Sequence, residues 1–149
     1  MIKIQIPATS ANLGAGFDAL GLALTYYNYI EMEECDKIDI TAADGLDIPT
    51  DERNLIYISA KDLFAVCGKK LEGLKLIQTS NIPMARGLGS SSACIIAGLV
   101  GANKMLGDPL TKDDLVDLAA QIEGHPDNTA PALLGGIVTA VFDERKVHW

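Results

Sequence analysis

The sequence lacks a long hydrophobic run and an excess of positive charge. Its longest apolar stretch, Ala93 to Val100, is too short to span a bilayer and contains Gly98. The first six residues alternate apolar and polar side chains, unlike a signal peptide. Acidic side chains number 20 against 12 basic ones, a formal net charge of −8. We therefore expect a soluble protein with neither membrane nor nucleic acid as a partner, because this field repels a polyphosphate backbone. It does not exclude a small nucleotide.

The sequence also lacks paired cysteines. Its three cysteines, Cys35, Cys67 and Cys94, are scattered and form no C-x-x-C motif. Such a set favours reduced thiols and a cytoplasmic location, with the thiols serving mainly as small buried residues. The composition of 48% hydrophobic and 21% charged residues supplies enough apolar material for a core and excludes a disordered chain.

Local patterns predict an α+β fold. Ile2, Ile4 and Ile6 alternate with polar residues, which predicts a half-buried strand that Pro7 should end. A small, polar loop should follow, up to Asp18. Strands and helices then alternate without the regular rhythm of a doubly wound sheet. Further strands are expected at Tyr27–Met32, Ile38–Thr41, Leu74–Thr79 and Ile137–Phe142.

Three helices should back these strands. Apolar spacing predicts one from Asn54 to Val66, with Asn54 as its cap and Gly68 after its end. A second, buried helix should run from Ser90 to Leu106, and two glycines within it would let another element approach closely. A third should begin at Thr111, where Asp114 completes a capping box, and should end at Glu123. The two glycines of the second helix are Gly98 and Gly101.

The segment between the fourth expected strand and the buried helix is the strongest chemical signal. Its glycines let the backbone turn its amides inward, and the helix start adds unpaired N–H groups with partial positive charge. Together these features suit a phosphate. No Walker lysine follows the glycines, and the Rossmann pattern is incomplete. A serine cap behind a flexible loop is the plain alternative, but consecutive serines opening so apolar a helix favour phosphate binding. The segment consists of Pro83, Met84, Ala85, Arg86, Gly87, Leu88, Gly89, Ser90, Ser91, Ser92 and Ala93.

Three motifs in order resemble the superfamily of galactokinase, homoserine kinase, mevalonate kinase and phosphomevalonate kinase. Residues Pro83 to Ala93 resemble its phosphate-binding motif, and Pro7 to Asp18 resemble its first motif as homoserine kinases carry it. Glu123 to Pro131 is also similar to homoserine kinases. The resemblance implies the superfamily's N-terminal domain, a fold shared with a ribosomal protein domain. Since such relatives are about twice as long, residues 1–149 would be an N-terminal ATP-binding kinase domain in a truncated chain without the ferredoxin-like C-terminal domain.

The resemblance implies an ATP and Mg²⁺ site. Residues 83–93 would wrap the triphosphate, with Ser90 as the Mg²⁺ ligand among the serines. Asn54 falls at an adenine-side position, although a role as helix cap alone is at least as well supported. Relatives carry a second metal-side carboxylate. Spacing assigns it to Asp117, with Glu123 as the competing candidate.

The resemblance also implies a site for the second substrate. Asn12 would hold the hydroxyl end and Asp18 the ammonium, although a loop aspartate in an Asx turn is the simpler interpretation of Asp18. His125 and Asn128 match further substrate-side positions; without the motif, His125 would be a packed or capping residue. Mevalonate-type relatives carry an aspartate base where this chain has Asn128, and an amide cannot accept the proton. The catalytic set would be Asn12, Ser90 and Asn128, working by alignment and charge stabilisation.

The leading hypothesis is therefore ATP-dependent phosphorylation of the L-homoserine side-chain hydroxyl, a step of threonine biosynthesis. The alternatives are a kinase of another small alcohol, such as a mevalonate-type enzyme, and a nucleotide-binding fragment without catalysis. Relatives supply carboxylate-binding arginines from the second domain. Exposed apolar surface would be covered either by that domain or by pairing of two copies into a homodimer.

Overall fold

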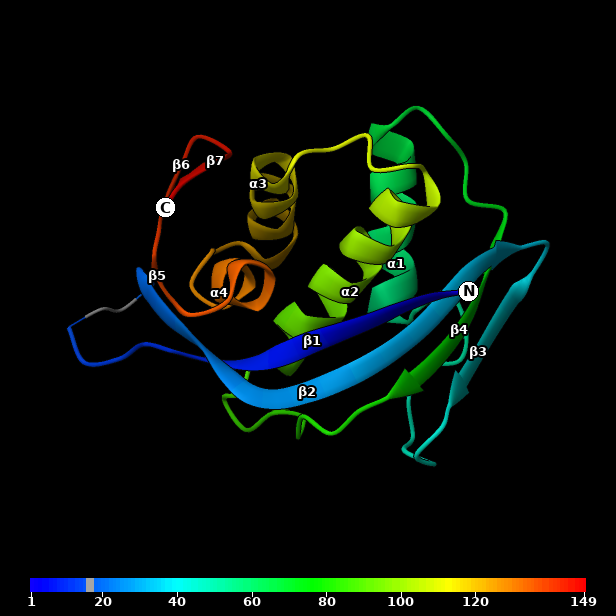
Figure 1. Ribbon diagram of the computed structural model, residues 1–149, viewed down its shortest axis with the longest axis horizontal. Coiled ribbons are helices and arrows are strands. Elements are labelled where there is room, and N and C mark those ends of the chain that lie inside the picture. The colour runs from blue at the N-terminus through cyan, green and yellow to red at the C-terminus, as the bar shows by residue number, and fades with distance from the viewer. Residues whose placement is uncertain (16–17) are drawn as a thin grey trace.

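The computed structural model describes residues 1–15 and 18–149. Gly16 and Phe17, which belong to the loop expected before Asp18, lie outside the described residues. The described chain forms a five-stranded sheet covered on a single face by helices (Figure 1) and a separate two-stranded hairpin, which confirms the α+β fold. The sheet has the order β1-β2-β4-β3, and β5 pairs with β2. Its strands are β1 (Ile2–Ala11), β2 (Leu20–Cys35), β3 (Ile38–Ala42), β4 (Gly73–Thr79) and β5 (Ile137–Thr139).

The first strand does not end at Pro7, so the expected boundary is wrong. Pro7 pairs with Tyr27, and β1 continues to Ala11 after a register shift between Pro7 and Thr9. In the sheet order β1 is an edge strand. A proline is tolerated there because no further strand requires its missing N–H. The extension buries Thr9 completely, at the end of the strand nearest the glycine-serine segment of residues 83–93.

The last expected strand is divided in two. β5 pairs with β2, whereas β6 (Val141–Asp143) pairs with β7 (Lys146–His148) in a separate hairpin. The Ala140 amide, between the two strands, donates to the Ala19 carbonyl. A short helix that the sequence analysis did not predict, α4 (Thr129–Leu134), precedes them. Its Pro131 lies in the first turn, where a missing N–H costs no helix hydrogen bond.

The three expected helices are confirmed, with their end signals. α1 (Leu55–Val66) is capped by Asn54, and Gly68 follows it at φ 68°. α2 (Ser90–Met105) is buried along most of its length. α3 (Lys112–Glu123) begins with the Thr111–Asp114 capping box.

Both glycines of α2 permit close contacts, as expected. A β-carbon at Gly98 would lie 2.8 Å from the β-carbon of Ser59 in α1, and one at Gly101 would lie 2.9 Å from the Ile4 side chain in β1. The core fills the space between the helices and the covered face of the sheet. Its largest fully buried side chains are Ile30, Met32, Ile56, Leu63, Phe64, Leu74, Leu76, Ile82, Ile95, Ile96, Leu99 and Val116. This packing fixes the start of α2 between β1 and α3. Among the described residues, no helix combines the length and apolarity that crossing a bilayer requires.

Candidate functional site

The start of α2 is not capped by a side chain. Gly89 is the N-cap in a left-handed conformation, and among the described residues no side chain makes a cap hydrogen bond to this helix start. The Ala93 amide donates to the Gly89 carbonyl at 2.9 Å, so the helix ladder begins only there. The preceding segment also turns through positive φ at Ala85 and Gly87. The amides of the first turn are therefore free to bind an anion, and the helix dipole favours negative charge at this end.

A hollow of about 290 Å³ lies beside this helix start. Met84, Ala85, Ser90 and Ser91 line one part of it. Its remaining lining residues are Ile48, Pro49, Arg53, Asn54, Leu55, Gln78 and Cys94. The site thus combines exposed amides with an adjoining, largely apolar space, which is the arrangement that a nucleotide requires.

Gln78 lines this hollow and is itself almost fully buried. Its Nε2 donates to the Ser80 hydroxyl at 2.7 Å, while its buried Oε1 has no hydrogen-bond partner within the described part of the chain. Because that oxygen is buried, a ligand in the hollow does not reach it in this arrangement. The fit to a nucleotide rests instead on the exposed amides of the helix start and on the largely apolar space beside them.

Asn54 uses both ends of its amide within the protein. Its Oδ1 accepts from the Ile56 amide at 2.9 Å, and its Nδ2 donates to the Pro49 carbonyl at 2.9 Å. The capping role is therefore confirmed. Since Asn54 also lines the hollow, its adenine-side role stays a prediction.

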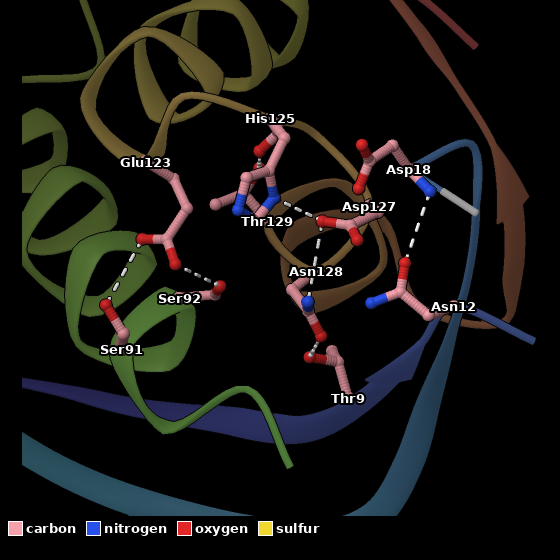
Figure 2. Close-up of polar contacts among 10 residues, drawn as sticks. All are labelled: Thr9, Asn12, Asp18, Ser91, Ser92, Glu123, His125, Asp127, Asn128 and Thr129. Atoms are coloured by element: carbon pink, nitrogen blue, oxygen red, sulfur yellow. Dashed lines mark hydrogen bonds and ion pairs between the residues drawn. The ribbon is translucent and has the colours of Figure 1, made fainter. Parts of the chain in front are cut away.

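Glu123, and not Asp117, lies at the serines that open α2. Ser91 Oγ donates to Glu123 Oε2 at 3.2 Å, and Ser92 Oγ donates to Oε1 at 3.3 Å (Figure 2). Hydroxyl and carboxylate oxygens suit Mg²⁺, which takes one or two carboxylates and completes its shell with water and phosphate oxygens. The described residues hold no group of three or more His, Cys, Asp or Glu side chains placed for a metal. A magnesium ion here would therefore depend on the phosphates of a nucleotide.

Asp117 is engaged elsewhere. Its Oδ1 accepts from the Val147 amide at 2.7 Å, and its Oδ2 pairs with Lys146 Nζ at 3.1 Å, so it ties β7 to α3. Glu123 follows it by six positions, which places the two side chains roughly 120° apart around the helix and roughly 9 Å apart along it. Spacing from His125 predicts Asp117 as the metal-side carboxylate, but the structure places Glu123 beside Ser91 and Ser92.

A second polar cluster lies on the other side of Gly89. The Thr9 hydroxyl donates to Asn128 Oδ1 at 2.8 Å, Asn128 Nδ2 donates to Asp127 Oδ1 at 3.4 Å, and Asp127 Oδ1 also contacts His125 Nδ1 (Figure 2). A β-carbon on Gly89 would lie 3.2 Å from Asn128 Oδ1. The glycine-serine segment and this cluster are therefore in contact.

Sequence reasoning gave no role to Thr9 or Asp127, although both are almost fully buried. Asp127 lies inside the motif that carried the resemblance, between His125 and Asn128. That position alone could have marked it. Thr9 had no such signal, because it was assigned to a loop and the alternation of β1 was thought to end before it.

The loop after β1 carries the two remaining predicted residues. Asn12 Oδ1 accepts from the Asp18 amide at 3.3 Å, and both residues have left-handed backbones, with φ of 58° and 55°. Asp18 and His125 line one hollow of about 320 Å³. The structure therefore brings Asp18 and His125 together. It ties Asn12 to Asp18, beside the cluster of Thr9, Asp127 and Asn128 (Figure 2).

Comparison with known proteins identifies this arrangement. The family model described as "GHMP kinases N terminal domain" matches residues 54–136, from the cap of α1 to the turn before β5. The chain belongs to the GHMP kinase family. The match includes both the glycine-serine segment and the His125–Asn128 cluster, and it confirms the superfamily and the fold that the three motifs predicted.

Three proteins that are similar to this GHMP kinase chain are described as homoserine kinases, one of them as a candidate. A homoserine kinase of Carboxydothermus hydrogenoformans is 50% identical over 152 residues, which cover 100% of this chain and 50% of the relative. A solved structure from Listeria monocytogenes, titled as a candidate homoserine kinase, matches with a TM-score of 0.86 at 43% identity, over 98% of this chain and 52% of that one. A homoserine kinase structure from Cytophaga hutchinsonii matches with a TM-score of 0.81 at 33% identity, over 93% of this chain and 47% of that one. The chain thus spans about half the length of the relatives it matches.

Proposed function

We propose that residues 1–149 form the ATP-binding half of an enzyme that transfers the γ-phosphoryl group of ATP to the side-chain hydroxyl of L-homoserine. The products would be ADP and O-phospho-L-homoserine, in the threonine branch of cytoplasmic amino-acid synthesis. One observation carries the proposal most directly. The uncapped start of α2 lies between a hollow suited to a nucleotide and a polar cluster suited to a small polar substrate.

The amides of Ser90, Ser91 and Ser92 would bind the phosphate oxygens of ATP. Left-handed turns at Gly87 and Gly89 leave the backbone open there, and no side chain caps the helix. The serine hydroxyls and Glu123 would hold Mg²⁺, with Glu123 in place of Asp117. When bound, the ion would neutralise charge that develops on the transferred phosphoryl group. Among the serines, the choice of Ser90 as ligand stays a prediction.

The second substrate would lie beside the His125–Asn128 segment. Asp18 would pair with its ammonium group, and His125 lines the same hollow. Asn12 and Asn128 would orient the reacting hydroxyl. Because Asn128 is an amide, no side chain at that position removes the proton. The rate would come from alignment and charge stabilisation, which suit a loose phosphoryl-transfer transition state.

ADP formation with and without L-homoserine tests this proposal. Two proteins should be compared: this chain, and this chain continued past Trp149 with the second half of the Carboxydothermus relative. We expect homoserine-dependent ADP formation by the continued protein, with mevalonate as an inactive control alcohol. If both proteins bind Mg-ATP and neither forms ADP in response to homoserine, the chain is a nucleotide-binding unit and the proposed reaction is wrong.

A further inference from the structure

Asp127 is a buried carboxylate whose polar partners, among the described residues, all come from its own segment. Its side chain is 1% exposed, and its Oδ1 contacts His125 Nδ1 and accepts from Asn128 Nδ2. Within the part of the chain that the structure describes, His125 is its only ion-pair partner. Burying a carboxylate is costly unless its oxygens accept hydrogen bonds, so both contacts are strongly favoured.

From this geometry we propose that Asp127 is a positioning residue, which fixes the proton of His125 and the orientation of the Asn128 amide. An ionised carboxylate can only accept hydrogen bonds. Nδ1 of His125 must therefore carry a hydrogen, which leaves Nε2 as an acceptor whenever the ring is neutral. The side chain of His125 is 43% exposed, and the residue lines the hollow that it shares with Asp18.

The same logic fixes Asn128. Its amide could in principle be turned either way, because oxygen and nitrogen have nearly the same shape. The carboxylate of Asp127 needs a donor, so the nitrogen faces Asp127. The oxygen then faces the Thr9 hydroxyl, which donates to it at 2.8 Å. One carboxylate thus sets the hydrogen-bonding character of His125, which lines the hollow with Asp18, and of Asn128.

This arrangement limits which end of the substrate can enter the hollow between Asp18 and His125. That the substrate is homoserine rests on the proposed function. A carboxylate and an imidazole acceptor both attract hydrogen-bond donors. The end of the substrate that enters here is therefore its ammonium or hydroxyl end, and not its carboxylate.

The protonation pattern of His125 can be measured directly in this chain. With only two histidines, ¹⁵N-histidine labelling gives two ring systems, and a His148→Gln variant assigns them. At a pH where both rings are neutral, we expect His125 in the Nδ1–H form, whereas a histidine side chain in water favours the Nε2–H form. A His125 ring that carries its hydrogen on Nε2 would overturn the inference. This measurement needs no substitution at Asp127.

Two matched variants distinguish a positioning role of Asp127 from a purely structural role. Asp127→Asn can donate to Nδ1, so the Nδ1–H form should lose its dominance. Asp18→Asn alters a carboxylate of the same hollow, whereas the hydrogen-bond partner of the ring among the described residues is Asp127, so this variant should leave the tautomer unchanged. In the continued protein, Asp127→Asn should raise KM for homoserine about tenfold or more and leave KM for ATP unchanged. Equal effects on both KM values would contradict positioning. Absence of any homoserine-dependent turnover would count against the proposed function, while the tautomer measurement would still decide this inference.

Discussion

Thr9 and Asn128 are 119 residues apart in the sequence, yet the Thr9 hydroxyl donates a 2.8 Å hydrogen bond to Asn128 Oδ1. The Thr9 amide also donates to the Leu88 carbonyl at 3.1 Å. Together these bonds join the end of β1, the glycine-serine segment and the start of α4 around Gly89. The proposed phosphate site and the proposed substrate site thus share one wall, as transfer between two bound molecules requires.

Gly89 should be the most sensitive glycine of the segment. A β-carbon there would collide with the Thr9 hydroxyl and approach Asn128 Oδ1. Gly89→Ala should therefore push apart the shared wall and weaken Mg-ATP binding by about tenfold or more. Titration calorimetry with a non-hydrolysable ATP analogue measures this loss.

Gly87→Ala is the matched control. Gly87 has nearly the same left-handed φ, 69° against 65°, but open space surrounds its missing side chain. Both variants lose about 1 kcal/mol from backbone strain, and only Gly89→Ala adds the collision. Equal losses of affinity in the two variants would contradict a role for the shared wall.

Glu123 should contribute to Mg²⁺-dependent nucleotide binding, whereas Asp117 should contribute to the stability of the fold. Glu123→Gln removes a carboxylate that contacts Ser91 and Ser92, so Mg²⁺-dependent nucleotide binding should weaken about tenfold while binding without Mg²⁺ stays unchanged. Asp117→Asn should lower the free energy of unfolding by about 1 kcal/mol, through the weaker bond to the Val147 amide, and should leave Mg²⁺ dependence intact. The reverse pattern would restore Asp117 as the metal-side carboxylate.

Asn54 should matter for stability whether or not a nucleotide is present. Asn54→Ala removes the acceptor for the first-turn amides of α1 and the donor to Pro49, and should cost about 1–2 kcal/mol in urea unfolding. Asn54→Asp keeps the cap and loses the donor, so it should cost less. If the alanine variant is as stable as the wild type, the cap carries no energy and nucleotide contact becomes the better explanation for this residue.

Cys94 should be a poor nucleophile at neutral pH. Burial, followed by the nearby charge of Glu123, raises the pKa of the Cys94 thiol from 9.0 to about 11. Between these values the folded chain keeps a proton that the unfolded chain releases. Stability should therefore fall as pH rises through this window, and this contribution should be fully present below pH 9.0.

Alkylation followed by mass spectrometry checks the reactivity of Cys94 in the folded and urea-unfolded chain. We expect much slower modification when the chain is folded. A Cys94→Ala variant should show a flatter loss of stability with pH across the same window. Rapid labelling of Cys94 in the folded chain near neutral pH would contradict the raised pKa.

Helices α1, α2 and α3 were predictable because their signals are local. Asn54, the Thr111–Asp114 box and the glycines at their ends act within one turn of the chain. The end of β1 was not predictable, because whether Pro7 breaks a strand depends on whether that strand lies at the edge of the sheet. Helix α4 has six residues, too few to show a period.

The candidate site also has a part that was predictable from the sequence and a part that was not. The glycine-serine segment and the His125–Asn128 motif are contiguous in sequence, so their letters could be matched. The choice between Asp117 and Glu123 depends on which side of α3 faces the serines, and spacing along the chain does not carry that information. Thr9 reaches its partner Asn128 only through the fold.

The proposed kinase function depends on phosphate binding by the first-turn amides of α2. The most direct test follows the backbone amide signals of Ser90, Ser91 and Ser92 by ¹H–¹⁵N NMR, while a Mg²⁺-bound non-hydrolysable ATP analogue is added and AMP serves as the control. We predict the largest shifts at these three amides with the triphosphate, and much smaller ones with AMP, which lacks the β- and γ-phosphates. Saturable binding that leaves these amides unmoved, or no binding at all, would contradict the account.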